Sequence, residues 1–265
     1  MSESDGEQVA RSVALEQAYV HEVYEQCAEK TVQSRHWPRI YQFLEELEPG
    51  ALVCDIGCGN GKYLSVNHSI FKVGVDRCKR FTDIAREKEN ELFQVLICDN
   101  LALPFRDESF DAVLSIAVVH HFATIERRVH ALKELARVLR IGGRLVISVW
   151  AMEQKHRKVK YKQFESQDVL IPWPKAYCMN SNRSKRSSAP YASNLHSNQN
   201  AQKFLSSSKE SLPSDRGGGA ITYHQYYHVF REGELDQLIN KYVENLHIIS
   251  SYYDHASWCI VAEKV

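Results

Sequence analysis

A glycine-rich stretch at residues 57–61 reads Gly-Cys-Gly-Asn-Gly and follows Asp55 at the end of an apolar run. Glycines separated by single residues let the backbone bend sharply and approach a ligand, at points where any Cβ would collide. The spacing of Gly57, Gly59 and Gly61 is G-x-G-x-G, whereas the dinucleotide fingerprint is G-x-G-x-x-G and places a pyrophosphate on a helix N-terminus. The pattern therefore favours S-adenosylmethionine, which has no pyrophosphate, over NAD. A plain tight turn is the alternative.

Carboxylates end the next two apolar runs. Asp76 follows the first of them, and Asp99, with Asn100 beside it, follows the second. A carboxylate at the tip of a neighbouring strand can hold a ribose diol, and an acid next to an amide can contact the edge of an adenine ring. Strand-end Asp residues also cap helices and satisfy turns, so each one alone is weak support. Because Asp55, Asp76 and Asp99 occur in the order expected of an adenosyl site, we predict that they bind the cofactor together with Asn100 and the glycines.

Length and composition fit one domain that carries an insertion. The chain has 265 residues, 44% of them apolar, and a formal net charge of zero. One full core is therefore expected, while attraction of nucleic acid by the whole molecule is not, so any such binding must come from local patches. We expect one core at 1–154 and 223–265, interrupted by a basic, Ser- and Asn-rich segment at 155–222 that is largely disordered.

The N-terminal residues are acidic and lack the apolar segment of a signal peptide, and no run approaches transmembrane length. We therefore expect a soluble, cytoplasmic protein without membrane contact, which could also enter the nucleus. The seven cysteines show no paired C-x-x-C spacing, so the sequence predicts buried thiols and no metal site.

Apolar runs alternate with amphipathic segments, a pattern typical of a mostly parallel sheet covered on both faces. Strands are expected near 51–55, 71–75, 93–98, 110–116 and 143–150. Helices are expected near 13–28, from Pro38 to before Pro49, and near 61–66, 79–89, 126–140 and 232–240, the one at 126–140 stopped by Gly142-Gly143. The runs 246–253 and 258–262 predict an antiparallel hairpin that closes the sheet.

Several longer strings resemble the eukaryotic tRNA wobble-uridine carboxymethyl methyltransferases. They are Asp-Ile-Gly-Cys-Gly-Asn-Gly-Lys-Tyr-Leu (55–64), Ser-Ile-Ala-Val-Val-His-His-Phe (115–122), Glu-Arg-Arg-Val (126–129), Val-Trp-Ala-Met-Glu-Gln (149–154), Gln-Asp-Val-Leu-Ile-Pro-Trp (167–173) and Tyr-His-Val-Phe-Arg-Glu-Gly-Glu-Leu (227–235). The likeness covers nearly everything outside the first dozen residues and the insertion. It implies an α/β fold, a seven-stranded Rossmann-like class I methyltransferase sheet with a C-terminal antiparallel hairpin.

The resemblance also implies an activity and its partners. The expected reaction is S-adenosylmethionine-dependent esterification of wobble 5-carboxymethyluridine to 5-methoxycarbonylmethyluridine, on the tRNA anticodon loop. We expect the stand-alone form, without the oxygenase domain that one member carries. A small zinc-ribbon activator protein is the implied partner, and the strand at 93–98, at the sheet edge in this fold, could pair with it.

Methylating a carboxylate needs little proton transfer, because a group with a pKa near 4 is already ionised at neutral pH. Placement of the oxygen on the methyl group is what the site must supply. His120 or His121 could orient the carboxylate, although either could instead satisfy a backbone carbonyl. Trp150, at a strand end, could stack on the uracil ring. Arg35 could bind a carboxylate or a phosphate bidentately, but the segment after it is shorter than in relatives, which makes its position uncertain.

Two other functions fit the same core. A small-molecule carboxyl methyltransferase would not need the basic cluster at 155–162, which is otherwise a candidate contact with tRNA or a solvated loop. A non-catalytic adaptor would keep the fold and lose methyl transfer. Arg127, Arg128, Arg137 and Arg140 are expected on one helix, mostly as solvated surface charge.

Overall fold

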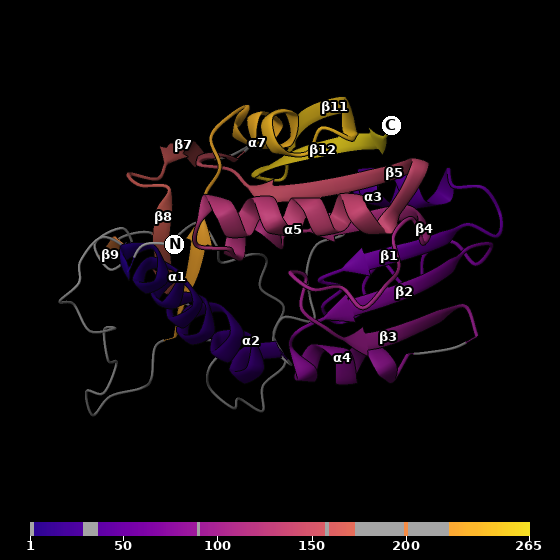
Figure 1. The fold of residues 1–265 in the computed structure, drawn as a ribbon, viewed down its shortest axis with the longest axis horizontal. Coiled ribbons are helices and arrows are strands. Elements are labelled where there is room, and N and C mark those ends of the chain that lie inside the picture. The colour runs from indigo at the N-terminus through magenta and orange to yellow at the C-terminus, as the bar shows by residue number, and fades with distance from the viewer. Residues whose placement is uncertain (1–2, 29–36, 89–90, 157–158, 173–198, 201–222) are drawn as a thin grey trace.

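A seven-stranded sheet in the order β11-β12-β5-β4-β1-β2-β3 forms the centre of the computed structural model (Figure 1). The structure describes residues 3–28, 37–88, 91–156, 159–172, 199–200 and 223–265. The parallel strands are β1 (Leu52–Ile56), β2 (Phe71–Asp76), β3 (Phe93–Ile97), β4 (Phe110–Ile116) and β5 (Leu139–Trp150). The hairpin of β11 (Leu246–Asp254) and β12 (Ser257–Lys264) pairs antiparallel with β5. The predicted fold class, with its closing hairpin and β3 at the edge, is confirmed.

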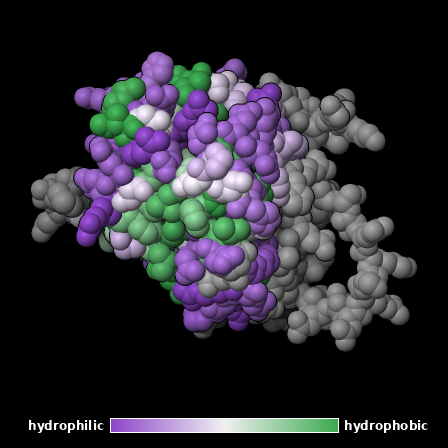
Figure 2. Space-filling model, turned by 90° about the vertical axis from the view of Figure 1, so that its right-hand side faces the viewer, coloured by the Kyte–Doolittle hydropathy of each residue, from purple (hydrophilic) through white to green (hydrophobic). Residues whose placement is uncertain are grey.

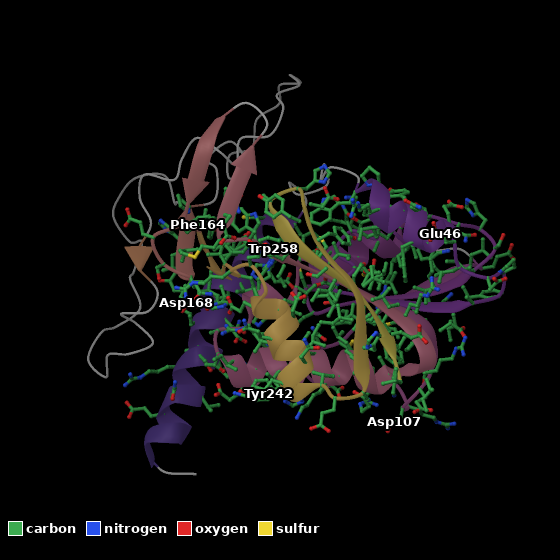
Figure 3. All side chains as sticks on the ribbon, turned by 90° about the horizontal axis from the view of Figure 1, so that it is seen from above. Glu46, Asp107, Phe164, Asp168, Tyr242 and Trp258 are labelled. Atoms are coloured by element: carbon green, nitrogen blue, oxygen red, sulfur yellow. The ribbon has the colours of Figure 1, made fainter. Side chains whose placement is uncertain are left out.

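Helices cover both faces of this sheet. Helices α5 (Ile125–Val138) and α7 (Glu234–Tyr242) pack on one face, and α3 (Pro38–Glu45) packs on the other. Figure 3 shows these layers from above, with Tyr242 and Asp107 on the first side and Glu46 on the second. Helix α4 (Lys79–Arg86) lies against β3. Each fully buried Leu or Ile in these layers stabilises the fold by about 1.5–3 kcal/mol relative to an exposed one.

An N-terminal helical segment crosses the carboxyl ends of the strands (Figure 1). It consists of α1 (Glu3–Glu16), a π-helical turn at Gln17–His21, and α2 (Glu22–Cys27), so the helix begins earlier than expected. Buried Glu16 fixes the segment to α5: its carboxylate accepts Arg127 Nε at 2.8 Å, Arg127 Nη2 at 2.6 Å and the Ala123 amide at 2.8 Å. A π-helical turn is rare and often marks a functional site.

A smaller layer of strands extends from the end of β5. It contains the pair β6 (Glu153–His156) and β7 (Val159–Gln163), and a sheet of β10 (His224–His228), β8 (Asp168–Pro172) and β9 (Gln199–Asn200). Part of the predicted insertion at 155–222 therefore forms strands. Residues 173–198 and 201–222, which include most of the stretch predicted to be disordered, lie outside the described residues.

Two predicted elements are wrong. Residues 61–66 form turns instead of a helix, because Gly61 takes a positive φ of 74° that interrupts helical geometry. The helix predicted at 126–140 ends at Val138, where Leu139 at once becomes extended (φ −76°, ψ 134°) and begins β5. Gly142-Gly143 therefore lies inside a strand and does not stop the helix.

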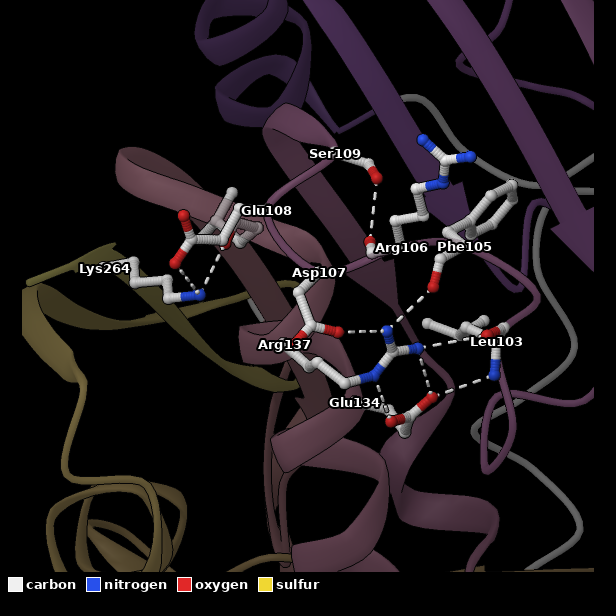
Figure 4. A network of polar contacts seen from close by, with 10 residues as sticks. Leu103, Phe105, Arg106, Asp107, Glu108, Ser109, Glu134, Arg137 and Lys264 are labelled. Carbon is white, nitrogen blue, oxygen red and sulfur yellow. Dashed lines mark hydrogen bonds and ion pairs between the residues drawn. The ribbon is translucent and has the colours of Figure 1, made fainter.

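Most of the arginines expected as solvated charge make structural contacts. Arg137 holds the loop before β4: it donates to Glu134, to Asp107 Oδ1 at 2.8 Å and to the carbonyls of Phe105 and Leu103 (Figure 4). Arg128 is buried and donates to the Phe122 carbonyl, and Arg140 lies in β5 and pairs with Asp111. The prediction of solvated charge is wrong for Arg128, which is buried, and for Arg127 and Arg137, whose side chains are 19% and 29% exposed in pairs with Glu16 and Glu134. Arg140 lies outside the helix, but its side chain is 53% exposed, as expected of surface charge.

Figure 2 views the side of the molecule that carries the amino ends of the parallel strands, where apolar side chains gather within a mostly hydrophilic surface. Phe71, Ile141 and Val265 are among the exposed large apolar residues. Among the helices the structure describes, none is long and apolar enough to cross a bilayer. Within the described ranges, no group of His, Cys, Asp or Glu is arranged to hold a metal ion.

Candidate active site

The predicted acids meet at one edge of the sheet. Asp55 ends β1 and pairs in register with Gly74 of β2, and Asp76 ends β2 and pairs with Ile97 of β3. Asp99 follows β3 directly. Because the carboxyl ends of neighbouring parallel strands lie side by side, these carboxylates form one row.

The glycine loop after β1 leaves room in front of this row. Gly57 has a φ of 80°, and a Cβ there would lie 2.2 Å from Val118 Cγ2, so only glycine fits. Gly59 also has a positive φ, of 54°, but a Cβ there would meet no heavy atom within 4 Å of the described structure. The loop is therefore closed toward the protein at Gly57 and open at Gly59, where a ligand could approach the backbone.

Asp55 is buried at the foot of the loop. Its Oδ2 atom is enclosed and has no hydrogen-bond partner among the described residues. Burial, and then the nearby charge of Asp76, raise the pKa of Asp55 from 3.8 to about 7, although the Lys62 ammonium opposes the shift. Burial also lowers the pKa of Lys62 to about 8. A buried carboxylate without a partner is costly, and a cationic ligand would remove that cost.

Asp76 fixes the shape of the loop. Its Oδ2 accepts the Gly59 amide at 2.9 Å and its Oδ1 accepts the Cys78 amide at 2.8 Å. Burial raises the pKa of Asp76 to about 6, and these amide hydrogen bonds limit the rise. Each carboxylate oxygen retains a lone pair, so Asp76 can hold the loop and still accept from a ribose diol.

Asp99 and Asn100 differ in their contacts. Asp99 accepts from Arg77 Nη1 at 2.8 Å and from the Leu101 amide at 2.9 Å. Asn100 is buried, and neither its Oδ1 nor its Nδ2 has a partner within the described ranges. A buried amide normally finds partners for both ends. The Asn100 amide is therefore the better match to the edge of an adenine ring, which offers both a donor and acceptors.

These residues fit S-adenosylmethionine. The unpartnered Asp55 oxygen can meet its positive charge, Asp76 its ribose and Asn100 its adenine, while the open side of Gly59 admits the backbone contact. The unpartnered atoms carry this fit, since they are costly in the absence of a ligand.

Structure separates His120 from His121, which the sequence could not. His121 is fully engaged: Nδ1 lies 3.0 Å from the Tyr226 carbonyl and Nε2 lies 2.8 Å from the Tyr24 hydroxyl. Nδ1 of His120 lies 3.0 Å from the Trp150 amide, which must donate to it, so the proton of the neutral ring is on Nε2. No partner for His120 Nε2 is present in the described structure, which leaves this N–H able to donate to a substrate.

Both imidazoles are neutral at physiological pH. Burial lowers the pKa of His121 to about 4 and lowers that of His120 well below its ordinary value, with the neighbouring histidines adding to the shift. They sit in the turn Val119–His121, two residues after Ala117, which has a positive φ of 63°. Strain at a residue other than glycine is often found next to a functional site.

Aromatic rings surround the histidine pair. The Tyr227 ring centroid lies 4.6 Å from that of Trp150, 5.2 Å from His120 and 4.9 Å from His121. Phe164 also packs edge-on against Trp150, with ring centroids 5.7 Å apart. Figure 3 shows Phe164 and Asp168 at the same end of the sheet as Trp258, far from Glu46 and Asp107. The structure therefore brings Trp150 to the histidines as predicted.

Sequence reasoning missed the residues that cover the site. Tyr24 of α2 links both sides of it, because its hydroxyl binds His121 and its ring lies 5.4 Å from that of Phe81 in α4. Glu25, next to it, accepts the Lys79 amide at the start of α4. Tyr227 begins the segment 227–235, but only the fold shows that its ring packs against Trp150, His120 and His121. Arg35 lies outside the described residues.

Comparison with known proteins agrees with this geometry. The methyltransferase-domain family matches residues 54–147. Over 256 residues the chain is 34% identical to the tRNA (carboxymethyluridine(34)-5-O)-methyltransferase of Schizosaccharomyces pombe, and the match covers 95% of this chain and 99% of that protein. The chain belongs to the tRNA carboxymethyluridine(34) methyltransferase family.

Other relatives of this family are longer. The chain is 41% identical over 266 residues to tRNA (carboxymethyluridine(34)-5-O)-methyltransferase alkbh8 of Xenopus tropicalis, across 95% of this chain and 41% of that protein. It is 54% identical over 169 residues to "Probable tRNA methyltransferase 9B" of Mus musculus, across 63% of this chain and 36% of that protein. The chain therefore spans less than half the length of these two relatives.

A solved structure supports the fold. A SAM-dependent methyltransferase from Methanosarcina mazei superposes with a TM-score of 0.54 at 18% identity, covering 88% of this chain and 99% of the other. At this identity the likeness concerns the fold alone, and it agrees with the class I methyltransferase sheet described above.

Proposed function

We propose that the protein transfers a methyl group from S-adenosylmethionine to the carboxylate of 5-carboxymethyluridine at the tRNA wobble position, which forms 5-methoxycarbonylmethyluridine. One observation carries the proposal: the yeast relative whose printed name gives this reaction matches the chain over 99% of its own length. The site supports it, because unpartnered buried atoms of Asp55 and Asn100 lie where the donor would bind.

The donor would supply an electrophilic methyl group. The carboxylate oxygen would form a bond to the methyl carbon while the bond from that carbon to the sulfonium sulfur breaks, leaving S-adenosylhomocysteine as the neutral thioether. The carboxylate needs no base, since it is already ionised at neutral pH. His120 would orient it by donating Nε2–H to one oxygen while the other faces the methyl group. The depressed pKa of His120 keeps the ring neutral, so it can position the nucleophile without the full charge that would weaken it.

The aromatic wall would hold the base. Trp150 and Tyr227 come from β5 and β10 and pack at 4.6 Å between ring centroids beside His120. Aromatic rings bind a splayed-out base by stacking, at about 1–3 kcal/mol per base. Arg35 and the basic segment at 155–162 remain proposed contacts with carboxylate or phosphate.

The partner we propose for β3 is the small zinc-ribbon activator. This strand is the edge of the sheet, and Leu96 and Ile97 on it are 41% and 45% exposed. An exposed apolar edge strand is a template for a strand from another chain. Production alone should give poorly soluble protein, and co-expression with the activator should raise the yield. Monomeric, soluble behaviour that the activator does not change would count against this pairing.

The experiment that tests the function is nucleoside mass spectrometry of tRNA, after incubation with isotope-labelled donor, the protein and the activator. The expected product is labelled 5-methoxycarbonylmethyluridine, and Asp55→Asn and Asp76→Asn should abolish it. Donor binding without this product would favour the adaptor. Methyl esters formed on small carboxylic acids, unaffected by added tRNA, would favour the small-molecule enzyme.

A further inference from the structure

The turn between β11 and β12 has an unusual composition. Asp254 and Ser257 are paired, so His255 and Ala256 form a two-residue hairpin turn, with φ values of 46° and 62°. Such a turn normally carries Asn-Gly or a similar pair, since residues with a Cβ rarely adopt a positive φ. A less favourable residue kept in a turn points to a use for its side chain.

The His255 ring is held in place from two sides. Its Nδ1 lies 2.6 Å from Asp254 Oδ1, and its ring stacks on Trp37, with centroids 5.7 Å apart and an interplanar angle of 21°. The side chain of His255 nevertheless remains 31% exposed. The stack therefore has an ordered ring with a face or edge reachable by solvent.

A cation follows Trp37 by two residues, on the helix that Trp37 precedes. Arg39, in the first turn of α3, places its guanidinium 4.3 Å from the ring centroid of Tyr252, at the end of β11. Arg39 is exposed, so its guanidinium can bind an anion while it rests on the ring. An ordered aromatic stack beside a cation is the combination that binds single-stranded nucleic acid: rings receive bases and the cation receives phosphate.

The position relative to the active site identifies the occupant. Ser257 pairs with Trp150, and the Ala256 carbonyl accepts the Ala151 amide at 2.9 Å. The backbone of the turn thus leads directly into the strand paired with Trp150, whose ring is proposed to hold the target base. The backbones of paired strands lie about 4.8 Å apart. The chain has no net charge to attract RNA as a whole, so contacts of this local kind are required.

We propose that Trp37, His255 and Arg39, supported by Tyr252, bind the nucleotide of single-stranded RNA next to the methylated uridine, its base on the ring stack and its phosphate on Arg39. This inference rests on the proposed function, because it takes the target uridine to lie at Trp150. It assigns the rim formed by α3 and the β11–β12 turn a part in substrate binding.

A double-mutant cycle between protein and RNA tests the contact. Binding of an anticodon stem-loop RNA containing 5-carboxymethyluridine is measured by fluorescence anisotropy for the full chain and for His255→Asn. Asn tolerates a positive φ, so the turn is kept while the ring is lost. The same measurements use two RNAs that are abasic at the nucleotide before or after the target.

Loss of the ring should weaken binding of the intact RNA about tenfold and leave binding of one abasic RNA unchanged. Arg39→Gln should reduce the slope of log K against log salt by roughly 0.7. Lys241→Gln, which removes a cation over Tyr242 on the opposite face, is the matched control and should change neither value. Equal losses from His255→Asn with all three RNAs would overturn the proposal, as would absence of RNA binding by the unmodified chain. The binding measurements contain no donor and do not depend on methyl transfer. Failure of the proposed function would therefore show only in the nucleoside mass spectrometry, as no methyl ester from a protein whose RNA binding is still coupled to His255.

Discussion

Asp55→Asn should make the donor-free protein more stable while it destroys the donor site. The carboxylate has an enclosed oxygen without a partner, and burial is the main cause that raises its pKa from 3.8 to about 7. A raised carboxyl pKa means that the unfolded chain ionises before the folded one. The protein therefore has its full free energy of unfolding below about pH 4. Ionisation of Asp55 in the unfolded chain then lowers this free energy by about 4 kcal/mol as the pH rises to about 7 and above, at 1.36 kcal/mol per pKa unit.

Asn has the same shape as Asp and does not ionise, so the free energy of unfolding of the variant should not fall as the pH rises through this range. Urea unfolding at pH 8 should give Asp55→Asn a free energy of unfolding higher than that of the unmodified protein by up to about 4 kcal/mol, and the difference should shrink toward pH 4. Asp83→Asn is the control: this exposed acid pairs with Lys79 within α4 and should change stability by less than about 1 kcal/mol. If Asp55→Asn were equally or less stable at pH 8, burial of the ionised Asp55 carboxylate would carry no cost for a cationic ligand to remove.

Further predictions concern the residues around this site. Glu16→Gln breaks a buried bidentate pair with Arg127 and should lower the free energy of unfolding, measured by urea denaturation at pH 7, by about 3 kcal/mol. A change below about 1 kcal/mol would show that this pair does not hold α1 on α5. His120→Ala should reduce kcat/KM for tRNA by roughly 100-fold and leave donor affinity unchanged. His121→Ala should mainly reduce thermal stability, because His121 bonds Tyr24 and the Tyr226 carbonyl. Similar effects of both variants on kcat/KM, without a loss of stability, would refute the different roles of the two histidines. Burial is the largest single influence on the pKa values of Asp168 and Glu234 and raises them, but the hydrogen bonds and charge of His228, together with further hydrogen bonds and the Arg128 charge, lower both overall. The contacts of His228 with Asp168 and Glu234 should therefore stabilise the fold above about pH 4.5 and weaken as the pH falls through the lowered carboxyl pKa values. His228→Gln should make the melting temperature fall less steeply with decreasing pH in this acid range, and an unchanged slope would contradict the prediction.

Local patterns predicted which residues meet at the carboxyl ends of the strands. The glycine loop and the acids at strand tips depend on residues close in sequence, and the order of parallel strands then brings Asp55, Asp76 and Asp99 together. The same reasoning placed the closing hairpin and Trp150. It mistook residues 61–66 for a helix, because an amphipathic pattern does not report the positive φ of Gly61.

Long-range contacts were beyond the sequence. Tyr24 and His121 are 97 residues apart, and Glu16 and Arg127 are 111 apart, so no local spacing reveals either pair. The difference between His120 and His121 depends on which ring nitrogens already have partners, and that is a property of the fold. The start of β5 at Leu139 shows how pairing with β4 outweighs the local signal of Gly142-Gly143.

The most direct test of the central claim is calorimetric titration of S-adenosylmethionine into the unmodified chain and into Asn100→Ala. Because the Asn100 amide has no partner among the described residues, its removal should leave the melting temperature of the donor-free protein unchanged or higher. The account predicts binding at one site, weakened roughly 5- to 150-fold in the variant, since a hydrogen-bonded amide contributes about 1–3 kcal/mol. Equal affinity of the two proteins, or no binding by the folded unmodified chain, would contradict it.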